Sequence, residues 1–233
     1  MNPEPNEKKE LEIATSTGEY SRRAVKTHFV SPGEDYIELF KKYVEPYYEE
    51  GDIVSVSEKI IALCQNRIVR REDMHISAAA KFLSKFASHP DYGIGVGETI
   101  KMQFAIDQVG LPKVLFASAA GAITKLFGKK GVFYEIVGQE VSGLDGFYDH
   151  VWSEYRDIGI MIPENPSAVC NEVKNTLGIT CMIVDANDIG QEILGKSDDI
   201  KLTDKELIEI IADNPAGQGR QCTPFILIHK SEK

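Results

Sequence analysis

The feature that most constrains the fold is an uninterrupted apolar run, Ile179–Val184, that ends in the polar sequence Asp185-Ala186-Asn187-Asp188. A strand that reads as a continuous apolar run is covered by other elements on both of its faces. Helical patterns with recognisable ends flank it, including a proline start after Asn165 and a T-x-x-E capping box at Thr203. Because helix and strand patterns are mixed along the chain, we predict an α/β (mixed α+β) fold.

The remaining pattern predicts one domain over residues 21–233, preceded by a flexible tail over residues 1–20. The expected helices are Asp35–Tyr47, Ser77–Ser88, Thr99–Val109, Val114–Phe127, Asn165–Gly178 and Thr203–Ala212. The expected strands and extended segments are Ile53–Ser57, Lys59–Val69, Phe133–Val137, Ile158–Ile162, Ile179–Val184 and Pro224–Ile228.

Charge and composition exclude several classes of protein. The 233-residue chain has a net charge of −10, and such a surface repels phosphate backbones, so we expect no nucleic-acid partner. The most apolar run, Val114–Ile123, is shorter than the roughly 20 residues that cross a membrane, so we expect a buried helix there and no membrane partner. The N-terminus lacks the apolar stretch of a signal peptide, and the four cysteines form no C-x-x-C spacing, which together predict a cytoplasmic protein with reduced thiols.

Two acidic residues are candidates for holding a cation. Asp185 directly follows the buried strand, and open α/β sheets bind ligands at the carboxyl ends of their strands. Asp145 lies in the tight turn Ser142-Gly143-Leu144-Asp145-Gly146. Carboxylate oxygens are the ligands that Mg²⁺ prefers. On spacing alone, the alternative that both are ordinary polar turns stays open.

Two glycine-containing loops are candidates for phosphate binding. In Asn214–Gln221, backbone N–H groups and Arg220 are suited to an anion, and Gly93–Gly97 precedes an expected helix. Neither loop has the spacing of a dinucleotide fingerprint or a Walker loop, so plain connections remain the alternative. The five histidines form no ligand spacing, and no G-x-S-x-G motif is present, so we propose neither a zinc enzyme nor a serine hydrolase.

Five segments, in order, resemble one known family. They are Gly51–Val69 (a G-D turn, a strand and a basic-apolar continuation), Ser142–Gly146 (S-G-I-D), Ile162–Pro166 (L-P-E-D-P), Ile183–Asp185 (I-S-D), and Gly217–Gly219 with Pro224–Ile228 (G-Q-G…P-V-V-L-I). On these motifs, which span most of residues 25–230, the chain resembles a divergent member of the coenzyme F-420-0:L-glutamate (γ-glutamyl) ligase family. The segment of about residues 90–132 matches the family poorly.

The resemblance implies a ligase-like fold, usually dimeric, and an activity that joins L-glutamate to a small-molecule carboxylate with GTP and two divalent cations, Mg²⁺ or Mn²⁺. The implied metal ligands are Asp145, Asp185 and Gln218. The implied nucleotide-binding residues are Thr27, His28, Phe29, Val30, Glu58, Lys59, Tyr148, Asn214, Gly217, Gln218, Gly219 and Arg220. The expected state is a homodimer.

The sequence also departs from the family pattern. Leu63 stands where the family has a second lysine, Ala186 where it has a hydroxyl residue after the strand-end aspartate, and Tyr148 where it has an asparagine. The first hypothesis is therefore an amide ligase. The second is a non-catalytic protein that binds nucleotide and metal on the same fold, and the third is a nucleotide phosphohydrolase.

Overall fold

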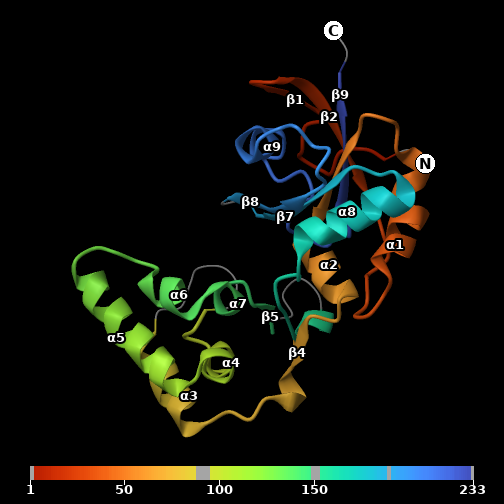
Figure 1. Ribbon diagram of the computed structural model, residues 1–233. Helices are drawn as coiled ribbons and strands as arrows, with labels where there is room; N and C mark the ends of the chain where they lie inside the picture. The colour runs from red at the N-terminus through yellow and green to blue at the C-terminus, as the bar shows by residue number, and fades with distance from the viewer. Residues whose placement is uncertain (1–2, 88–94, 148–152, 188–189, 232–233) are drawn as a thin grey trace. The chain divides into compact units, whose positions relative to one another are not determined.

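A computed structural model describes residues 3–87, 95–147, 153–187 and 190–231 (Figure 1). The chain, for which the sequence predicts one domain over residues 21–233, divides into two compact units. The sheet unit consists of Met1–Asn66 and Pro163–Lys233, and the helical unit consists of Arg67–Ile162. The sheet unit is therefore built from both ends of the chain, and the helical unit is inserted into it in sequence.

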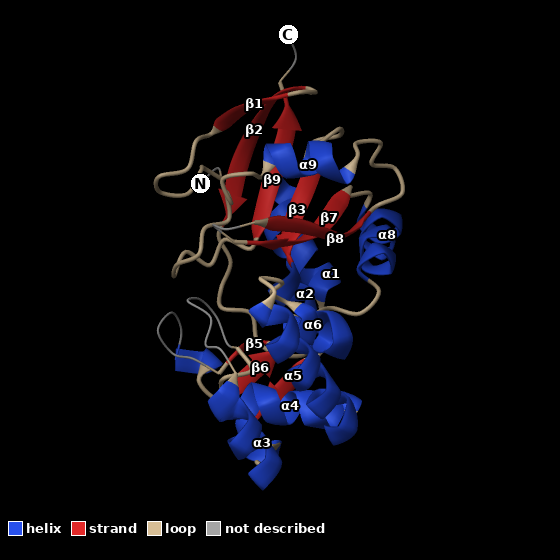
Figure 2. Ribbon diagram, turned by 90° about the vertical axis from the view of Figure 1, so that its left-hand side faces the viewer, coloured by secondary structure: helices blue, strands red, loops and turns tan. Residues whose placement is uncertain are grey.

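The sheet unit contains a six-stranded mixed sheet in the order β1-β2-β9-β3-β7-β8 (Figure 2). Only β3 and β7 among these neighbours pair in parallel, and the other neighbours pair antiparallel. The strands are β1 (Glu12–Thr15), β2 (Gly18–Val25), β3 (Ile53–Ser57), β7 (Cys181–Ala186), β8 (Gln191–Lys196) and β9 (Phe225–Lys230).

Both faces of this sheet are covered, as the apolar run predicts. Cys181 and Ile183 of β7 pack into a core with the helices on one face, whereas Met182 and Val184 pack into a second core on the other. The first core includes residues of α1 (Tyr36–Leu39), α2 (Glu58–Cys64) and α8 (Pro166–Leu177), and the second includes α9 (Asp204–Ile210). The predicted mixed α/β class is confirmed.

Local signals place the helices of the sheet unit. The carboxylate of Asp35 accepts the N–H groups of Ile37 (2.7 Å) and Glu38 (3.4 Å) at the start of α1, which continues through a π-helical segment, Phe40–Val44, and a 3-10 turn, Glu45–Tyr47. The predicted capping box of Thr203 is present at α9, and α8 ends in a left-handed Gly178.

Three local predictions differ from the structure. The expected tail, residues 1–20, contains β1 and the first residues of β2, which are tied to the sheet by the buried Tyr20 and by the buried Arg22 just beyond the tail. Residues expected to be extended after β3 form α2, whose Ile61, Ala62 and Leu63 are all buried. The expected strand Phe133–Val137 is the helix α6 (Val132–Val137). A short apolar run is ambiguous between a strand and a buried helix, which explains the last two errors.

The helical unit has its own core and a small antiparallel sheet in the order β4-β6-β5. Its described strands are β4 (Ile68–Arg70), β5 (Asp145–Gly146) and β6 (Ile158–Ile160). Its described helices are α3 (Ala78–Leu83), α4 (Thr99–Val109), α5 (Leu111–Leu126), α6 and α7 (Gln139–Ser142). α4 and α5 meet at Gly110, whose φ of +82° favours glycine.

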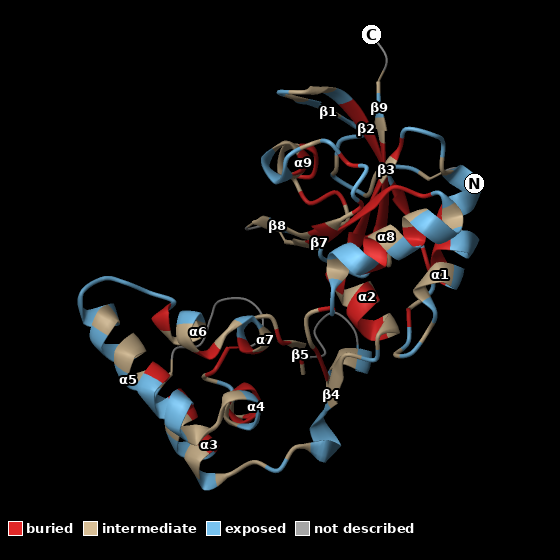
Figure 3. Cartoon of the chain, in the orientation of Figure 1, coloured by how far each residue is buried: buried red, intermediate tan, exposed pale blue. Residues whose placement is uncertain are grey.

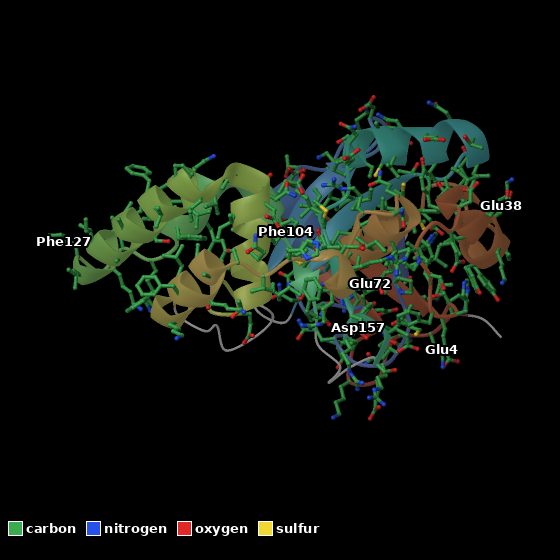
Figure 4. The ribbon with its side chains drawn as sticks, turned by 90° about the horizontal axis from the view of Figure 1, so that it is seen from below. Glu4, Glu38, Glu72, Phe104, Phe127 and Asp157 are labelled. Carbon is green, nitrogen blue, oxygen red and sulfur yellow. The ribbon has the colours of Figure 1, made fainter. Side chains whose placement is uncertain are left out.

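α5 is covered on one face only, so the expectation of a buried helix is half correct (Figure 3). Ala117 is buried, and a side chain added at Gly121 would lie 3.4 Å from Phe133 of α6. The opposite face exposes Phe116 by 66%, and Figure 4 shows Phe127 directed away from the ribbon just beyond the helix. Total apolarity does not reveal which face of a helix is covered. No helix in the described ranges is long and apolar enough to cross a membrane.

Candidate functional site

Most of the predicted nucleotide-binding segments lie at one edge of the six-stranded sheet. β2, β3 and β7 run in one direction and β9 runs in the other, so three strand ends and one strand start share this edge. In the pairing register, Val25 lies opposite Phe225, and Ser57 lies opposite Val184. The segments Thr27–Val30, Glu58–Lys59, Asn214–Arg220 and Asp185 extend from these four positions.

Backbone hydrogen bonds beyond the strands fix this edge. The N–H of Thr27 donates to the carbonyl of Cys222 (2.8 Å), and the N–H of Ser57 donates to the carbonyl of Pro224 (2.9 Å). The residues just before β9 are thereby held between the continuations of β2 and β3. Glu58, the next residue after Ser57, is buried and begins α2, with Lys59 following it.

The segment Thr27–Val30 is well anchored. Thr27 and Val30 are buried, and the Thr27 hydroxyl donates to the His28 carbonyl (2.8 Å). The His28 ring contacts the Tyr43 hydroxyl through Nδ1 (2.6 Å) and the Glu34 carboxylate through Nε2 (2.8 Å). His28 is thus oriented by two side chains, while its ring stays 41% exposed at the surface of the sheet unit.

The loop Asn214–Gln221 has a buried base and an exposed tip. Asn214 and Pro215 are buried, whereas the three residues Gln218, Gly219 and Arg220 are exposed. Gly217 has a φ of +73°, and its N–H donates to the Asn214 carbonyl (3.0 Å). An exposed tip on a rigid base is the arrangement of a binding loop.

Residues near the N-terminus hold the base of this loop. The Asn6 amide donates to the Pro215 carbonyl and to the Thr223 hydroxyl, both at 2.8 Å. The Lys9 ammonium donates to the Asp213 carbonyl, and the guanidinium of Arg22 pairs with the Asp213 carboxylate. The segment that the sequence assigns to a flexible tail therefore supports the proposed nucleotide loop.

Asp185 lies near the end of β7, where it is partly buried and pairs in register with Glu192 of β8. Beyond β7, the Oδ1 of Asn187 accepts the N–H of Gly190 (3.0 Å). The side-chain amide of Gln191 donates to the carbonyls of Asn187 and Ala212, both at 3.0 Å, which ties the start of β8 to the residue before Asp213. Asp185 and Gln218, two predicted metal ligands, thus belong to one unit, and Asp188 lies outside the described residues.

The third predicted ligand, Asp145, belongs to the helical unit, where it forms β5 with Gly146 and pairs with Ile160 of β6. Its Oδ1 accepts the N–H of Gly146 (2.9 Å). Gly146 has a φ of +98°, and a side chain there would lie 2.4 Å from the Ile158 carbonyl oxygen. Only glycine fits beside Asp145, so the turn geometry depends on the S-G-L-D-G sequence.

Sequence reasoning missed Lys101, a buried residue of α4 in the same unit as Asp145. Its ammonium donates to the carbonyls of Ser142 (3.0 Å) and Leu144 (2.8 Å). Burial lowers the pKa of Lys101 to about 8, while the charge of Asp145 opposes this effect. The available signal was a single lysine within the largely apolar helix Thr99–Val109, but its burial depends on the tertiary fold.

Two other predictions concern Tyr148 and the glycine loop Gly93–Gly97. Tyr148, Gly93 and Ile94 lie outside the described residues. The rest of the glycine loop forms a turn before α4, in which the N–H of Glu98 donates to the Gly95 carbonyl (2.9 Å). Its Val96 N–H donates to the Tyr134 hydroxyl (3.2 Å), so this part of the loop is tied to α6.

The oxygen-rich donors at the predicted metal positions suit a hard cation. Within the described part of the chain, no three His, Cys, Asp or Glu side chains form a metal-binding group. Mg²⁺ commonly takes one or two protein carboxylates and completes its shell with water and substrate phosphates. The donor chemistry of Asp145, Asp185 and Gln218 agrees with that mode of binding, and their role as ligands of two cations stays a prediction.

One family model matches part of the chain. Residues 24–127 match the sequence model of the family described as F420-0:Gamma-glutamyl ligase. The predicted resemblance to this family is confirmed. No curated protein matches the chain.

The matched range includes Thr27–Val30, Glu58, Lys59 and Lys101. It also covers most of residues 90–132, the segment in which the motifs of the sequence resemble the γ-glutamyl ligase family poorly. The mixed α/β fold fits the ligase-like fold, and the family supports amide-bond formation as the general type of reaction.

Proposed function

We propose that this protein is a metal- and nucleotide-dependent amide ligase that adds L-glutamate to a small-molecule carboxylate, as in coenzyme F-420 γ-glutamylation. GTP is the proposed co-substrate, and Mg²⁺ or Mn²⁺ is the proposed cation. We further propose a cytoplasmic homodimer. The observation that carries the proposal is the convergence of Thr27–Val30, Glu58–Lys59, Asp185 and the Asn214–Gln221 loop on one edge of the sheet.

Each segment has a role in this proposal. The exposed tip of the loop, Gln218–Arg220, offers a guanidinium and backbone N–H groups to phosphate oxygens. Lys59 offsets further negative charge on the nucleotide. The proposed cation ligands are Asp145, Asp185 and Gln218, as the resemblance implies, and bound cations would neutralise charge on the phosphates.

The proposed reaction has two steps. A carboxylate oxygen of the acceptor attacks the γ-phosphorus of GTP, which forms an acyl phosphate and releases GDP. The amine nitrogen of L-glutamate then attacks the acyl carbon, forms the amide, loses a proton and expels phosphate. The protein contributes mainly by holding acid, amine and phosphate in register.

A second candidate is a non-catalytic protein that binds nucleotide and metal on the same fold. Two positions favour it. Leu63, where the family has a lysine, is only 1% exposed and packs in the sheet unit, so this position contributes no charge to a nucleotide. Ala186 provides no side-chain oxygen next to Asp185.

Calorimetric titration distinguishes these candidates. GTP and ATP are titrated into the full chain with and without Mg²⁺ or Mn²⁺, and phosphate release is then measured with L-glutamate and the F-420 precursor. We expect cation-dependent binding of GTP that Lys59→Met weakens and that Lys205→Met, an exposed lysine of α9, leaves unchanged.

Binding followed by glutamate-dependent phosphate release supports the ligase. Binding without release identifies the non-catalytic protein, and release without glutamate identifies a phosphohydrolase. Failure of both nucleotides to bind under every cation condition rules out the proposed site.

A further inference from the structure

Lys101 directs its ammonium group at the turn that carries Asp145. The side chain is 3% exposed, and Nζ donates to the carbonyl oxygens of Ser142 (3.0 Å) and Leu144 (2.8 Å). The same nitrogen lies 5.6 Å from the centre of the Tyr134 ring. α4 thereby holds both the beginning of the turn and the residue directly before Asp145.

Holding a turn with a buried ammonium group carries a desolvation penalty. An apolar side chain of similar length would avoid this desolvation penalty but would make no hydrogen bond to the turn. The charge of Asp145 favours the charged form of Lys101, in addition to the two hydrogen bonds to carbonyls. The lysine therefore acts on the turn through its hydrogen bonds.

The Asp145 carboxylate is fixed within its own turn. Its Oδ1 accepts the Gly146 N–H (2.9 Å), and the backbone at Gly146 adopts a conformation that favours glycine. The Asp145 side chain is thus hydrogen-bonded within its own turn, and Lys101 holds that turn from α4. The Gly146 N–H reports on the orientation of this side chain, because its hydrogen bond ends on the carboxylate itself.

We propose that Lys101 is a positioning residue for Asp145: it holds the Ser142–Asp145 turn by the carbonyls of Ser142 and Leu144, and the turn fixes the carboxylate through the Gly146 N–H. For cation binding, the inference rests on the proposed function, in which Asp145 is a ligand. For the turn itself, it rests on the contacts within the helical unit.

Positioning and simple charge repulsion predict opposite effects on cation affinity. If Lys101 acted only as a nearby positive charge, its removal would strengthen the binding of Mn²⁺, since like charges repel. If Lys101 positions Asp145, its removal weakens Mn²⁺ binding, and residues that orient metal ligands typically contribute about 10–100-fold to affinity.

The test compares Lys101→Met, Lys101→Arg and Lys113→Met in the full chain. Lys113 is an exposed lysine of α5 and controls for the loss of one positive charge. Mn²⁺ affinity is measured with GTP present, and amide hydrogen exchange is measured at Gly146. We expect Lys101→Met to raise the Kd for Mn²⁺ about tenfold and to speed Gly146 exchange, Lys101→Arg to restore most of both, and Lys113→Met to change neither.

Unchanged Gly146 exchange in Lys101→Met overturns the proposal, and so does tighter or unchanged Mn²⁺ binding in a variant whose circular dichroism matches that of the original protein. If the original protein binds no Mn²⁺, the proposed function fails by itself. Gly146 exchange then decides the positioning role, since that readout needs no cation.

Discussion

The ion pair between Arg22 and Asp213 gives a quantitative prediction about the loop at the sheet edge. Arg22 is 1% exposed, and its guanidinium donates to the carbonyls of Ile210 (3.0 Å) and Glu10 (2.8 Å) as well as to the Asp213 carboxylate. Among the described residues, its Nε has no hydrogen-bond partner. The Asp213 carboxylate is therefore the main group that compensates for the buried charge.

Asp213→Asn removes this negative charge but keeps the size and one oxygen of the side chain. Breaking a buried ion pair from one side lowers stability by about 3–5 kcal/mol. The Asp213 side chain is 37% exposed, so water replaces part of the lost interaction. We expect the free energy of unfolding to fall by about 2–3 kcal/mol, which is just below that range because of this exposure.

Urea denaturation at pH 7, followed by circular dichroism, measures this loss. The matched control is Asp204→Asn, which removes the ion-pair partner of Lys196. Because the Asp204 side chain is 62% exposed, this variant should lower the free energy of unfolding by less than about 1 kcal/mol. A loss below about 1 kcal/mol for Asp213→Asn, equal to that of the control, would refute the reasoning. GTP affinity should also fall in Asp213→Asn, because Asp213 directly precedes the proposed nucleotide loop.

Three further predictions test local features. Gly195→Ala would place a Cβ 2.6 Å from the backbone carbon of Pro166, so it should lower stability by about 2–3 kcal/mol in denaturation, and a neutral effect would contradict this packing. Burial raises the pKa of the Cys64 thiol to about 12, so the reactive thiolate forms only as the pH approaches that value. At pH 8, Cys64 of the folded protein should therefore be alkylated at least about a hundredfold more slowly than in the unfolded chain, which mass spectrometry measures. Thr203→Ala removes the cap that accepts the Glu206 N–H, so the free energy of unfolding should fall by about 1 kcal/mol, and retention of full stability would show that the capping box contributes nothing.

The elements that the sequence predicts well have their signals within a few residues. Ile53–Ser57 and Thr99–Val109 have the same bounds in the structure, and α8 lies between its predicted proline start and its glycine end. The segment after β3 was predicted as extended because β-branched residues favour strands, yet the contacts around Ile61 make it helical. The intrinsic preference of the residues determines whether a short apolar run forms a strand or a helix only where tertiary packing does not override it.

In the candidate site, too, some features have local signals in the sequence and others depend on the tertiary fold. The strand-end Asp185 and the Asn214–Gln221 loop are visible in sequence, because polar residues interrupt apolar runs there. Their convergence with Thr27–Val30 depends on the pairing of β2 with β9 and of β9 with β3, which no local pattern encodes. Lys101 was missed for the same reason, since its burial follows from how α4 packs against the turn before β5.

The position of β9 between β2 and β3 has a consequence for how the protein is made. β2 and β3 leave the ribosome long before β9, so their facing edges stay unpaired while the whole helical unit is synthesised between them and the final strand. Pairings between residues so far apart in sequence form slowly, and exposed strand edges promote association between unfinished chains. Newly synthesised molecules therefore pass through a period in which the helical unit has been made and the six-stranded sheet still lacks its last strand.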